Sequence, residues 1–590
     1  MTVPEQGTPS GQKAAAQDYS SISGRGADLL VEALIRTGVR DLFGVPGDTG
    51  VAFYDALFSR TEEIRHVLAR DERHAAAMAD AYARVSGRVG VVEVSSGGGT
   101  TYVIGGLGEA FAAGVPLLVL TSDIHRGSRG SGALTEIDQE SLFAAVTKKT
   151  IVVGRAEDVP AAVAEALHTA TTGRPGPVAV IIPEDVLDEE ATSEVPPAAD
   201  RLGVPRERPA ALENEVDAVA RALVNSSLPA VLVGSGVHSS GAYRAVAQIA
   251  DRIGAGVATT IHGKGAIEES NPWALGVTGN NGGAALSHDY LAEADTVLIV
   301  GSRGNATDTD SHSAPPRSAT VIAVDIDPTR VSRNYPQALV LAGDAATVLE
   351  QILAQLPERD AAVVQARQAD LAARRAGQPA RSTTEPPQGR LLVDDVVDEL
   401  ARAFADFDPI VVADPGAPTP AVADRWPVRR VGREIIVPRG HGPMGYALPA
   451  AVGAAIARPG RPVLALTADG SFAMSCGELE TIVRLRLPVI AVQFTNHSFG
   501  WIKMLQHLYQ EGRYFGVDPG PIDAVAVAQA CGLHAARPTT IHALAQHVRA
   551  ALEDHLPLYL DVEVAHMIDV VPQVPAWHRA LAGERTRPVY

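Results

Sequence analysis

Hydrophobic positions along the chain form short apolar runs that alternate with longer stretches of helical character. From about residue 24 to 190, runs such as VGVVEV (89–94) and PLLVLTS (116–122) alternate with alanine-rich stretches such as DERHAAAMADAYARV (71–85). The apolar runs favour buried β-strands, and the alanine-rich stretches favour helices. This alternation predicts a parallel sheet covered by helices on both faces.

The same alternation returns twice further along the chain. Strand candidates are PAVLVGS, TVLIVGS and ATVIAVDID in the second part, and PIVVAD, PVLALTADG, PVIAVQFTN and LYLDVEV in the third. The connecting stretches at 191–210 and 356–390 show no sustained periodicity of hydrophobic residues. They contain runs rich in proline and charged residues, which is typical of linkers. We therefore expect an α/β fold of three doubly wound parallel-sheet domains, at 23–190, 211–355 and 391–575, with tails at 1–22 (flexible) and 576–590.

Composition and charge narrow the classes of function. The 590 residues exceed the size at which single cores stop growing, and 46% hydrophobic residues leave material for several cores. A net charge of −19 argues against nucleic-acid or anionic-membrane partners. The amino terminus has neither a basic start nor an apolar core, and no apolar run approaches the roughly 20 residues that span a bilayer. Because Cys476 and Cys531 show no metal-binding spacing, we expect a cytoplasmic protein in a reducing compartment.

Two polar segments follow neighbouring strand candidates in the third part of the chain. PVLALT runs into ADGSF, and PVIAVQF runs into TNHSFG, which places Asp469 and Asn496 after successive strands. Ligands collect at the carboxyl ends of strands in such sheets, and both side chains offer the oxygens that Mg²⁺ or Ca²⁺ prefers, with the Ser498 carbonyl as a third ligand. Gly470 allows close approach to a phosphate, and the helix beginning near Ser471 points amide groups at it. The alternative is ordinary turn chemistry, because Asp-Gly-Ser often follows a strand.

ADGSF followed by TNHSFG resembles the thiamine-diphosphate motif, which begins Gly-Asp-Gly and ends in Asn-Asn. The resemblance implies that Asp469, Asn496 and the Ser498 carbonyl bind Mg²⁺ beside the diphosphate of the cofactor. The segment GHGPMGYALPAAVGA (440–454) is similar to the family segment that holds the aminopyrimidine of the cofactor. The resemblance implies that the Gly442 carbonyl accepts a hydrogen bond from the amino group of this ring and that Met444 braces the cofactor. A plain core methionine is the alternative for Met444.

Further cofactor contacts follow from the same resemblance. Gly416 in DPGAPT (414–419) matches a cofactor-binding glycine. Ala417 and Pro418 stand where acetolactate synthases usually carry glutamine and histidine against the diphosphate, which puts cofactor affinity in question. Ala468 and Thr495 replace the first residues of Gly-Asp-Gly and Asn-Asn, and both changes leave the ligand positions intact.

LARDERHAAAMADAYAR (68–84) is similar to the family helix that carries the catalytic glutamate, and Glu72 matches that residue. In the family this carboxyl hydrogen-bonds a pyrimidine ring nitrogen and favours the imino tautomer that activates the thiazolium. The alternative is an exposed glutamate paired with Arg70 or Arg73. Asp71 replaces a histidine common before the glutamate, and the paired histidines of pyruvate decarboxylase-like enzymes are absent, which favours carboligation over simple decarboxylation.

The substrate pocket is expected around LFGVPGD (42–48), ALTEIDQ (133–139) and FGWIKM (499–504). The resemblance places Gly47, Thr135 and Trp501 there. Thr135 replaces a glutamine that acetolactate synthases carry close to the reacting carbonyl, and Trp501 takes a place often held by methionine. The acceptor side of the pocket is therefore expected to differ from theirs.

The middle domain raises the question of a flavin. GSRGNATDTDS (301–311) and AVDIDP (323–328) resemble the region where acetolactate synthases hold FAD, with Arg303 as the matching arginine. The acidic, threonine-rich stretch after Arg303 departs from the flavin-binding type, so FAD is the less favoured alternative. The expected cofactors are thiamine diphosphate and Mg²⁺.

The resemblance extends from about residue 24 to 570 and identifies an acetolactate synthase-like enzyme of the 2-oxo acid decarboxylase and carboligase superfamily. The expected reaction decarboxylates a 2-oxo acid such as pyruvate and ligates the acyl unit to a second carbonyl compound. A 2-oxo acid decarboxylase, a C–C bond hydrolase and a non-catalytic relative with a structural or regulatory role are the alternatives. In the family the cofactor lies between the first domain of one subunit and the third of another, which implies a homodimer or homotetramer.

Overall fold

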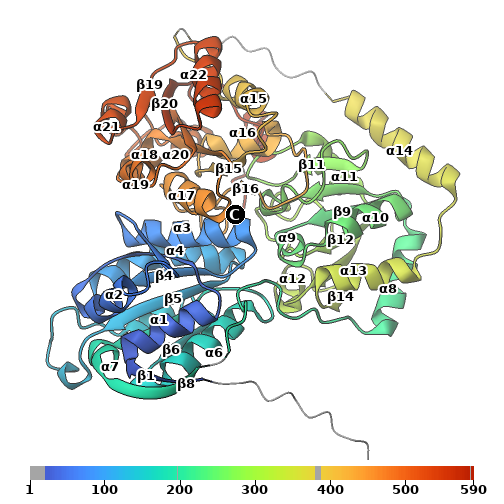
Figure 1. The fold of residues 1–590 in the computed structure, drawn as a ribbon. Helices are drawn as coiled ribbons and strands as arrows, with labels where there is room; N and C mark the ends of the chain where they lie inside the picture. Colours follow the sequence, from blue (N-terminus) through green and yellow to red (C-terminus); the bar gives the residue numbers. More distant parts are fainter. Residues whose placement is uncertain (1–19, 196, 379–386, 388, 585, 590) are drawn as a thin grey trace, which may run out of the picture.

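The computed structural model describes residues 20–195, 197–378, 387, 389–584 and 586–589. It contains three α/β domains, each built on a six-stranded parallel sheet, which confirms the predicted fold class. Figure 1 shows the first domain in blue, the third domain in orange and red above it, and the middle domain in green beside both.

The first domain has the strand order β3-β2-β4-β5-β7-β6. Its parallel strands are β2 (Asp41–Val45), β3 (Arg65–Leu68), β4 (Gly90–Val94), β5 (Leu117–Asp123), β6 (Lys149–Val152) and β7 (Val178–Pro183). Its helices are α1 (Gly26–Arg36), α2 (Val51–Phe58), α3 (Glu72–Ser86), α4 (Gly98–Ala113), α5 (Gln139–Phe143), α6 (Val159–Thr171) and α7 (Glu184–Asp188). Strands β4, β5 and β7 are buried throughout, as expected for a sheet covered on both faces.

The third domain has the order β16-β15-β17-β18-β20-β19, which is the arrangement of the first domain when strands are counted along each sheet's own chain segment. Its strands are β15 (Ile410–Ala413), β16 (Ile435–Ile436), β17 (Val463–Ala468), β18 (Val489–Thr495), β19 (His534–Ala536) and β20 (Leu558–Glu563). Its helices are α15 (Val393–Ala403), α16 (Pro418–Arg425), α17 (Ala447–Ala457), α18 (Asp469–Ser475), α19 (Glu478–Arg484), α20 (Gly500–Tyr509), α21 (Ala524–Ala530), α22 (Ile541–Asp554) and α23 (Pro575–Leu581).

The middle domain has the order β11-β10-β9-β12-β13-β14, so the direction of winding reverses between β9 and β12. Its strands are β9 (Pro229–Val233), β10 (Gly256–Thr259), β11 (Ala274–Val277), β12 (Thr296–Val300), β13 (Thr320–Asp325) and β14 (Leu339–Ala342). Its helices are α8 (Glu213–Asn225), α9 (Gly236–Ser240), α10 (Tyr243–Ile253), α11 (Ala285–Glu293), α12 (Pro328–Asn334), α13 (Ala345–Gln355) and α14 (Ala361–Ala376).

Helix α3 joins the first domain to the third. It begins where the Asp71 side chain accepts the Arg73 backbone N–H and ends at Gly87, whose φ of 70° suits glycine. It packs against α17 of the third domain, and a Cβ added to Gly453 would overlap the Met78 carbonyl. The alanine-rich composition therefore serves close helix packing between two domains.

Several predicted boundaries need correction. Residues 20–22 of the predicted tail belong to strand β1 (Ser20–Arg25), which pairs antiparallel with β8 (Glu190–Val195) at the start of the predicted linker 191–210. Residues 1–19 lie outside the described residues. The β1–β8 pair was not predicted, because its two strands are far apart in sequence and their side chains are mostly polar.

The stretches 356–390 and 576–590 also contain helices. Within the first, α14 buries Leu371 against the middle domain, while Arg367 donates to the Ile253 carbonyl at 2.6 Å. Within the second, α23 buries Trp577 completely against the third-domain core. One buried residue on the polar helix α14, and three on the short helix α23, give little periodic signal in the sequence.

None of the helices within the described residues is both long and apolar enough to cross a membrane.

Candidate active site

A pocket of about 190 Å³ opens at the carboxyl ends of strands β15, β17 and β18 in the third domain. It brings together nine residues selected from the sequence, namely Gly416, Gly442, Met444, Asp469, Gly470, Ser471, Asn496, Ser498 and Trp501. Parallel strands expose their carboxyl ends at one edge, so segments distant in sequence converge there. The pocket also includes Ala417, whose methyl group gives this wall an apolar surface.

Asp469 and Asn496 face each other across adjacent strands. Asp469 Oδ2 accepts the backbone N–H groups of Asn496 at 3.2 Å and His497 at 2.6 Å, and Oδ1 accepts that of Gly470 at 2.9 Å. Burial raises the pKa of the Asp469 carboxyl, against the effect of these hydrogen bonds. No arginine or lysine in the described part of the chain pairs with Asp469, and a bound cation would favour its ionised form.

This donor set fits Mg²⁺. The ion takes six oxygens and usually binds through one or two carboxylates while phosphates and water complete its shell. Asp469 supplies one carboxylate and Asn496 an amide oxygen, which here accepts the Ser498 N–H at 3.2 Å. The described residues contain no cluster of three or more His, Cys, Asp or Glu side chains suited to a metal, so a tighter all-protein site does not compete with it there.

The pocket floor offers a further donor for a phosphate group. The hydroxyl of Ser471 is buried and has no hydrogen-bond partner among the described residues. A buried hydroxyl without a hydrogen-bond partner lowers the stability of the fold unless a ligand provides that partner. A Cβ at Gly470 would lie 2.7 Å from the Phe499 ring and 3.2 Å from Met444, so this glycine also permits close packing of the pocket wall.

Gly442 lies on a loop that the first domain holds in place. Its φ is 79°, and the buried carboxylate of Glu109 accepts the backbone N–H groups of Gly440 at 3.2 Å, His441 at 2.7 Å and Gly442 at 3.3 Å. Burial alone would raise the pKa of Glu109, but His262, Arg84 and the His441 amide hold it below its usual range. Met444 is 37% exposed at the pocket, which disfavours the alternative of a core methionine.

Arg439 is a pocket residue that the sequence interpretation missed. Its Nε donates to Asn281 Oδ1 at 2.6 Å, and its guanidinium lies 5.4 Å from the centre of the Trp501 ring. Trp501 in turn packs on Trp577 with ring centres 4.5 Å apart. Arg439 directly precedes the segment 440–454 that resembles a cofactor-binding segment, and this position in the sequence could have indicated its place in the pocket.

Glu72, Gly47 and Thr135 lie together on the first domain. Glu72 is the first residue of α3, and a Cβ at Gly99 would lie 3.3 Å from its Oε1 and 3.1 Å from Ser95 Oγ. The Ser95 side chain also fills the space beside Gly47. Burial, with the Asp71 charge assisting, raises the pKa of the half-buried Glu72 carboxyl.

A second buried carboxyl, missed in the sequence interpretation, lies below this group. Glu93 is only 3% exposed in the central strand β4 and hydrogen-bonds the Tyr54 hydroxyl, which lies 3.1 Å from His66 Nε2. Burial raises the pKa of Glu93 to about 8, raises that of Tyr54, and lowers that of His66 to about 4. All three groups are therefore neutral near pH 7. A glutamate inside the apolar run VGVVEV was the signal.

The two groups of residues form separate half-sites within one chain. The third-domain pocket is lined only by residues between 415 and 502, and none of Glu72, Gly47 or Thr135 reaches it. Large apolar side chains beside both half-sites are exposed, among them Tyr102, Leu134, Met444 and Ile502.

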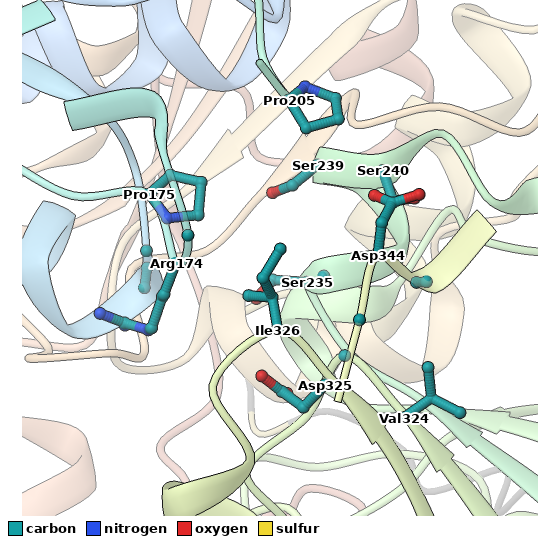
Figure 2. A pocket seen from close by; sticks show the side chains of 17 residues that line it. Arg174, Pro175, Pro205, Ser235, Ser239, Ser240, Val324, Asp325, Ile326 and Asp344 are labelled. Carbon is teal, nitrogen blue, oxygen red and sulfur yellow. The ribbon is translucent and has the colours of Figure 1, made fainter. Parts of the chain in front are cut away.

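A further crevice lies between the first domain and the middle domain, at the reversal of strand order in the middle-domain sheet. Figure 2 shows Arg174 on one side of it, with Asp325 and Asp344 on the other. Two adjoining cavities of about 90 and 70 Å³ share Arg174, Ser235 and Asp325. FAD binding at Arg303, which lines the smaller cavity, stays the less favoured prediction, and a visible absorption spectrum of the purified protein tests it.

Family models match all three domains. The N-terminal TPP binding domain of thiamine pyrophosphate enzymes matches residues 24–142, the central domain matches 216–352, and the C-terminal TPP binding domain matches 414–562. Thiamine pyrophosphate is another name for thiamine diphosphate.

Similar proteins cover nearly the whole chain. A probable acetolactate synthase large subunit of Methanocaldococcus jannaschii is 31% identical, with 93% of each chain aligned. Acetolactate synthase of Arthrospira platensis is 31% identical over 94% of this chain and 96% of that protein. Acetolactate synthase isozyme 3 large subunit of Escherichia coli K12 is 31% identical over 93% of this chain and 96% of that protein.

Proposed function

The chain belongs to the thiamine pyrophosphate enzyme family and is similar to acetolactate synthases, and from this premise we propose that it is a carboligase. The proposed reaction removes carbon dioxide from a 2-oxo acid such as pyruvate and joins the remaining acyl unit to a second carbonyl compound. The observation that carries the proposal is the convergence of Asp469, Asn496 and the unpaired Ser471 hydroxyl in one pocket.

We assign the third-domain pocket to the diphosphate and to Mg²⁺. Asp469, Asn496 and the Ser498 carbonyl would bind the ion, and the Ser471 hydroxyl would donate to a phosphate oxygen. Gly416 and Gly470 border the same space, and the Gly442 carbonyl and Met444 are assigned to the pyrimidine end. Glu109 keeps the Gly442 loop fixed through its three amide hydrogen bonds.

When bound, thiamine diphosphate supplies a nucleophilic ring carbon and an electron sink. Glu72 is assigned the proton transfer that activates it, because burial raises the pKa of this carboxyl and so favours the protonated form, which can donate to a ring nitrogen. Substituting glutamine keeps the size of the side chain and removes this proton exchange.

We propose that two copies of the chain complete each active site. Glu72 is on a different half-site from the Asp469 pocket, and the catalytic assignment requires both to meet one cofactor. Exposed apolar side chains at both half-sites, including Tyr102 and Met444, support burial against a second copy. A homodimer is the minimum assembly, and a homotetramer would contain two such dimers.

The direct test is carbon dioxide release from a panel of 2-oxo acids with thiamine diphosphate and Mg²⁺, alone and with aldehyde or ketone acceptors. Release that depends on both cofactors is expected, and a ligated product identifies a carboligase. An aldehyde as the sole product would identify the decarboxylase alternative, and turnover of a dione without carbon dioxide release the hydrolase.

A further inference from the structure

Hydroxyl groups form one wall of the first-domain half-site, and we call Thr49, Ser95, Ser96, Ser122 and Thr135 the hydroxyl wall. Ser96 Oγ lies 2.7 Å from Thr135 Oγ1, and Thr49 Oγ1 lies 3.2 Å from Ser96 Oγ and 2.8 Å from Ser122 Oγ. Thr49, Ser96 and Ser122 are buried, so the chain of hydrogen bonds is anchored in the domain. The arrangement fixes the position of the Thr135 hydroxyl at the edge of the half-site.

The backbone at Thr135 is in a conformation that threonine rarely adopts. Its φ is 67°, in the left-handed region that disfavours β-branched residues. It persists where the surroundings enforce it, and such residues gather at ligand sites. Here Gly97 packs so closely that an added Cβ would lie 2.7 Å from Thr135 Cβ. The structure therefore holds this side chain in place at a conformational cost.

Ser95 brings the hydroxyl wall next to Glu72. Its hydroxyl has no hydrogen-bond partner among the described residues, and its side chain is partly exposed. Both Ser95 Oγ and Glu72 Oε1 lie against Gly99, at 3.1 and 3.3 Å from the position of an added Cβ. A substrate oxygen beside Glu72 can thus receive a hydrogen bond from Ser95.

Positive charge is absent from this wall in the described part of the chain. No lysine or arginine hydrogen-bonds any of its hydroxyls. Arg73, next to Glu72 in sequence, is paired with Asp71 at 2.6 Å, and Arg70 packs its Cβ against Gly477 of the third domain. A desolvated carboxylate requires a cationic partner or several strong donors.

The third-domain pocket has one lining cation, Arg439. A 2-oxo acid donor brings one carboxylate to the completed site, and Arg439, held by Asn281 and the Trp501 ring, is the lining cation we assign to it. An acceptor that is itself a 2-oxo acid would bring a second carboxylate. The described lining of the third-domain pocket has no further cation, and no lysine or arginine hydrogen-bonds the hydroxyl wall. The charges of the two half-sites therefore match one acid and one neutral molecule.

We propose that the hydroxyl wall binds the acceptor, and that the acceptor is a neutral aldehyde or ketone with a hydroxyl beside its carbonyl. This rests on the proposed carboligase function. A 2-oxo acid and a hydroxyaldehyde give a dihydroxyketone and carbon dioxide. The electron pair left when the carboxylate carbon departs forms the new C–C bond, and the acceptor oxygen gains the π pair and one proton. No oxidant or reductant is needed.

The experiment compares acceptors at a fixed 2-oxo acid donor in the wild-type enzyme with its cofactors. Glycolaldehyde, acetaldehyde and a second 2-oxo acid are offered separately, and the products are quantified. We expect kcat/KM for glycolaldehyde to exceed that for the 2-oxo acid at least about tenfold, because a buried polar contact is worth that factor. An acidic product from two 2-oxo acids as the preferred outcome would overturn the proposal.

Variants of Thr135 test the wall itself. Thr135→Val removes the hydroxyl, Thr135→Ser retains it, and Thr192→Val on the remote strand β8 is the matched control. Thr135→Val should raise the KM for glycolaldehyde about tenfold or more while changing the donor KM less, with serine restoring the acceptor KM. Equal losses for donor and acceptor, or no rescue by serine, would contradict the assignment. Absence of carbon dioxide release in the wild type would instead show that the proposed function itself fails.

Discussion

The carboxylate of Asp469 accepts a 2.6 Å hydrogen bond from the backbone N–H of His497, so the ends of strands β17 and β18 are joined at the pocket. The same oxygen also accepts the Asn496 N–H at 3.2 Å. These contacts fix the Asp469 carboxylate beside the backbone of Asn496 before a ligand binds, and the Asn496 amide oxygen is itself held by the Ser498 N–H. Preorganised ligands of this kind favour a cation of defined geometry.

Asp469→Asn should weaken the metal site, because it removes its only carboxylate while leaving the side-chain shape. We expect the apparent affinity for Mg²⁺ in the presence of thiamine diphosphate to fall about tenfold to hundredfold. Calorimetric titration measures this change, with Asp289→Asn on the exposed face of α11 as the matched control. Unchanged Mg²⁺ affinity in Asp469→Asn would contradict the ligand assignment.

Mixing two inactive variants tests the division of the site between copies. Glu72→Gln and Asp469→Asn each disable every site in a homodimer, but a mixed dimer contains one site with both residues intact. Random re-association should therefore restore about a quarter of wild-type activity, because half of the dimers are mixed and half of their sites are complete. No recovery despite demonstrated exchange would indicate that each site lies within one chain.

Glu93 should make stability fall with rising pH. Its folded pKa is about 8 against an unfolded value of 4.5, so the folded chain binds the extra proton and loses that stabilisation as pH rises toward 8. His66 titrates the opposite way, but only below about pH 6.5, which leaves pH 6.5 to 8 for the test.

Glu93→Gln keeps the shape of the side chain and removes the titration. The wild type should lose more unfolding free energy than the variant between pH 6.5 and 8, by roughly 2 kcal/mol. Denaturant unfolding at several pH values measures the difference. Parallel pH profiles for the two proteins would show that Glu93 is ionised in the folded state.

Gly453→Ala should destabilise the junction between the first and third domains. The new methyl group would overlap the Met78 carbonyl, and overpacking of this kind costs about 1 to 3 kcal/mol. A lower melting temperature is expected, while Gly154→Ala, where an added Cβ meets nothing within 4 Å, should melt like the wild type. Equal melting temperatures would show that α3 and α17 separate without cost.

Much of the third-domain pocket was predictable because it depends on strand ends. Apolar runs such as PVLALT and PVIAVQF mark strands by composition, and their polar successors must lie at one edge of a parallel sheet. The positions of Asp469 and Asn496 directly after two such strands therefore predicted that the two residues lie at the same edge of the sheet. Gly442 and Met444 followed from the resemblance of a single continuous segment.

Other features depend on contacts that no local pattern contains. Arg439 reaches the pocket through Asn281 of the middle domain, and Trp577 is buried although its helix is short. The β1–β8 ribbon joins segments about 170 residues apart, and the cost of closing so long a loop leaves no trace in the residues themselves. The hydroxyl wall likewise joins four separate segments of the first domain.

The central claim is that Glu72 activates thiamine diphosphate bound at Asp469 and Asn496. Carbon dioxide release from 2-oxo acids, with and without thiamine diphosphate and Mg²⁺, in the wild type and in Glu72→Gln, tests it most directly. We predict release that requires both cofactors and falls at least about a hundredfold in the variant, while the variant still binds the cofactor. Cofactor-dependent release that Glu72→Gln leaves unchanged would contradict the claim.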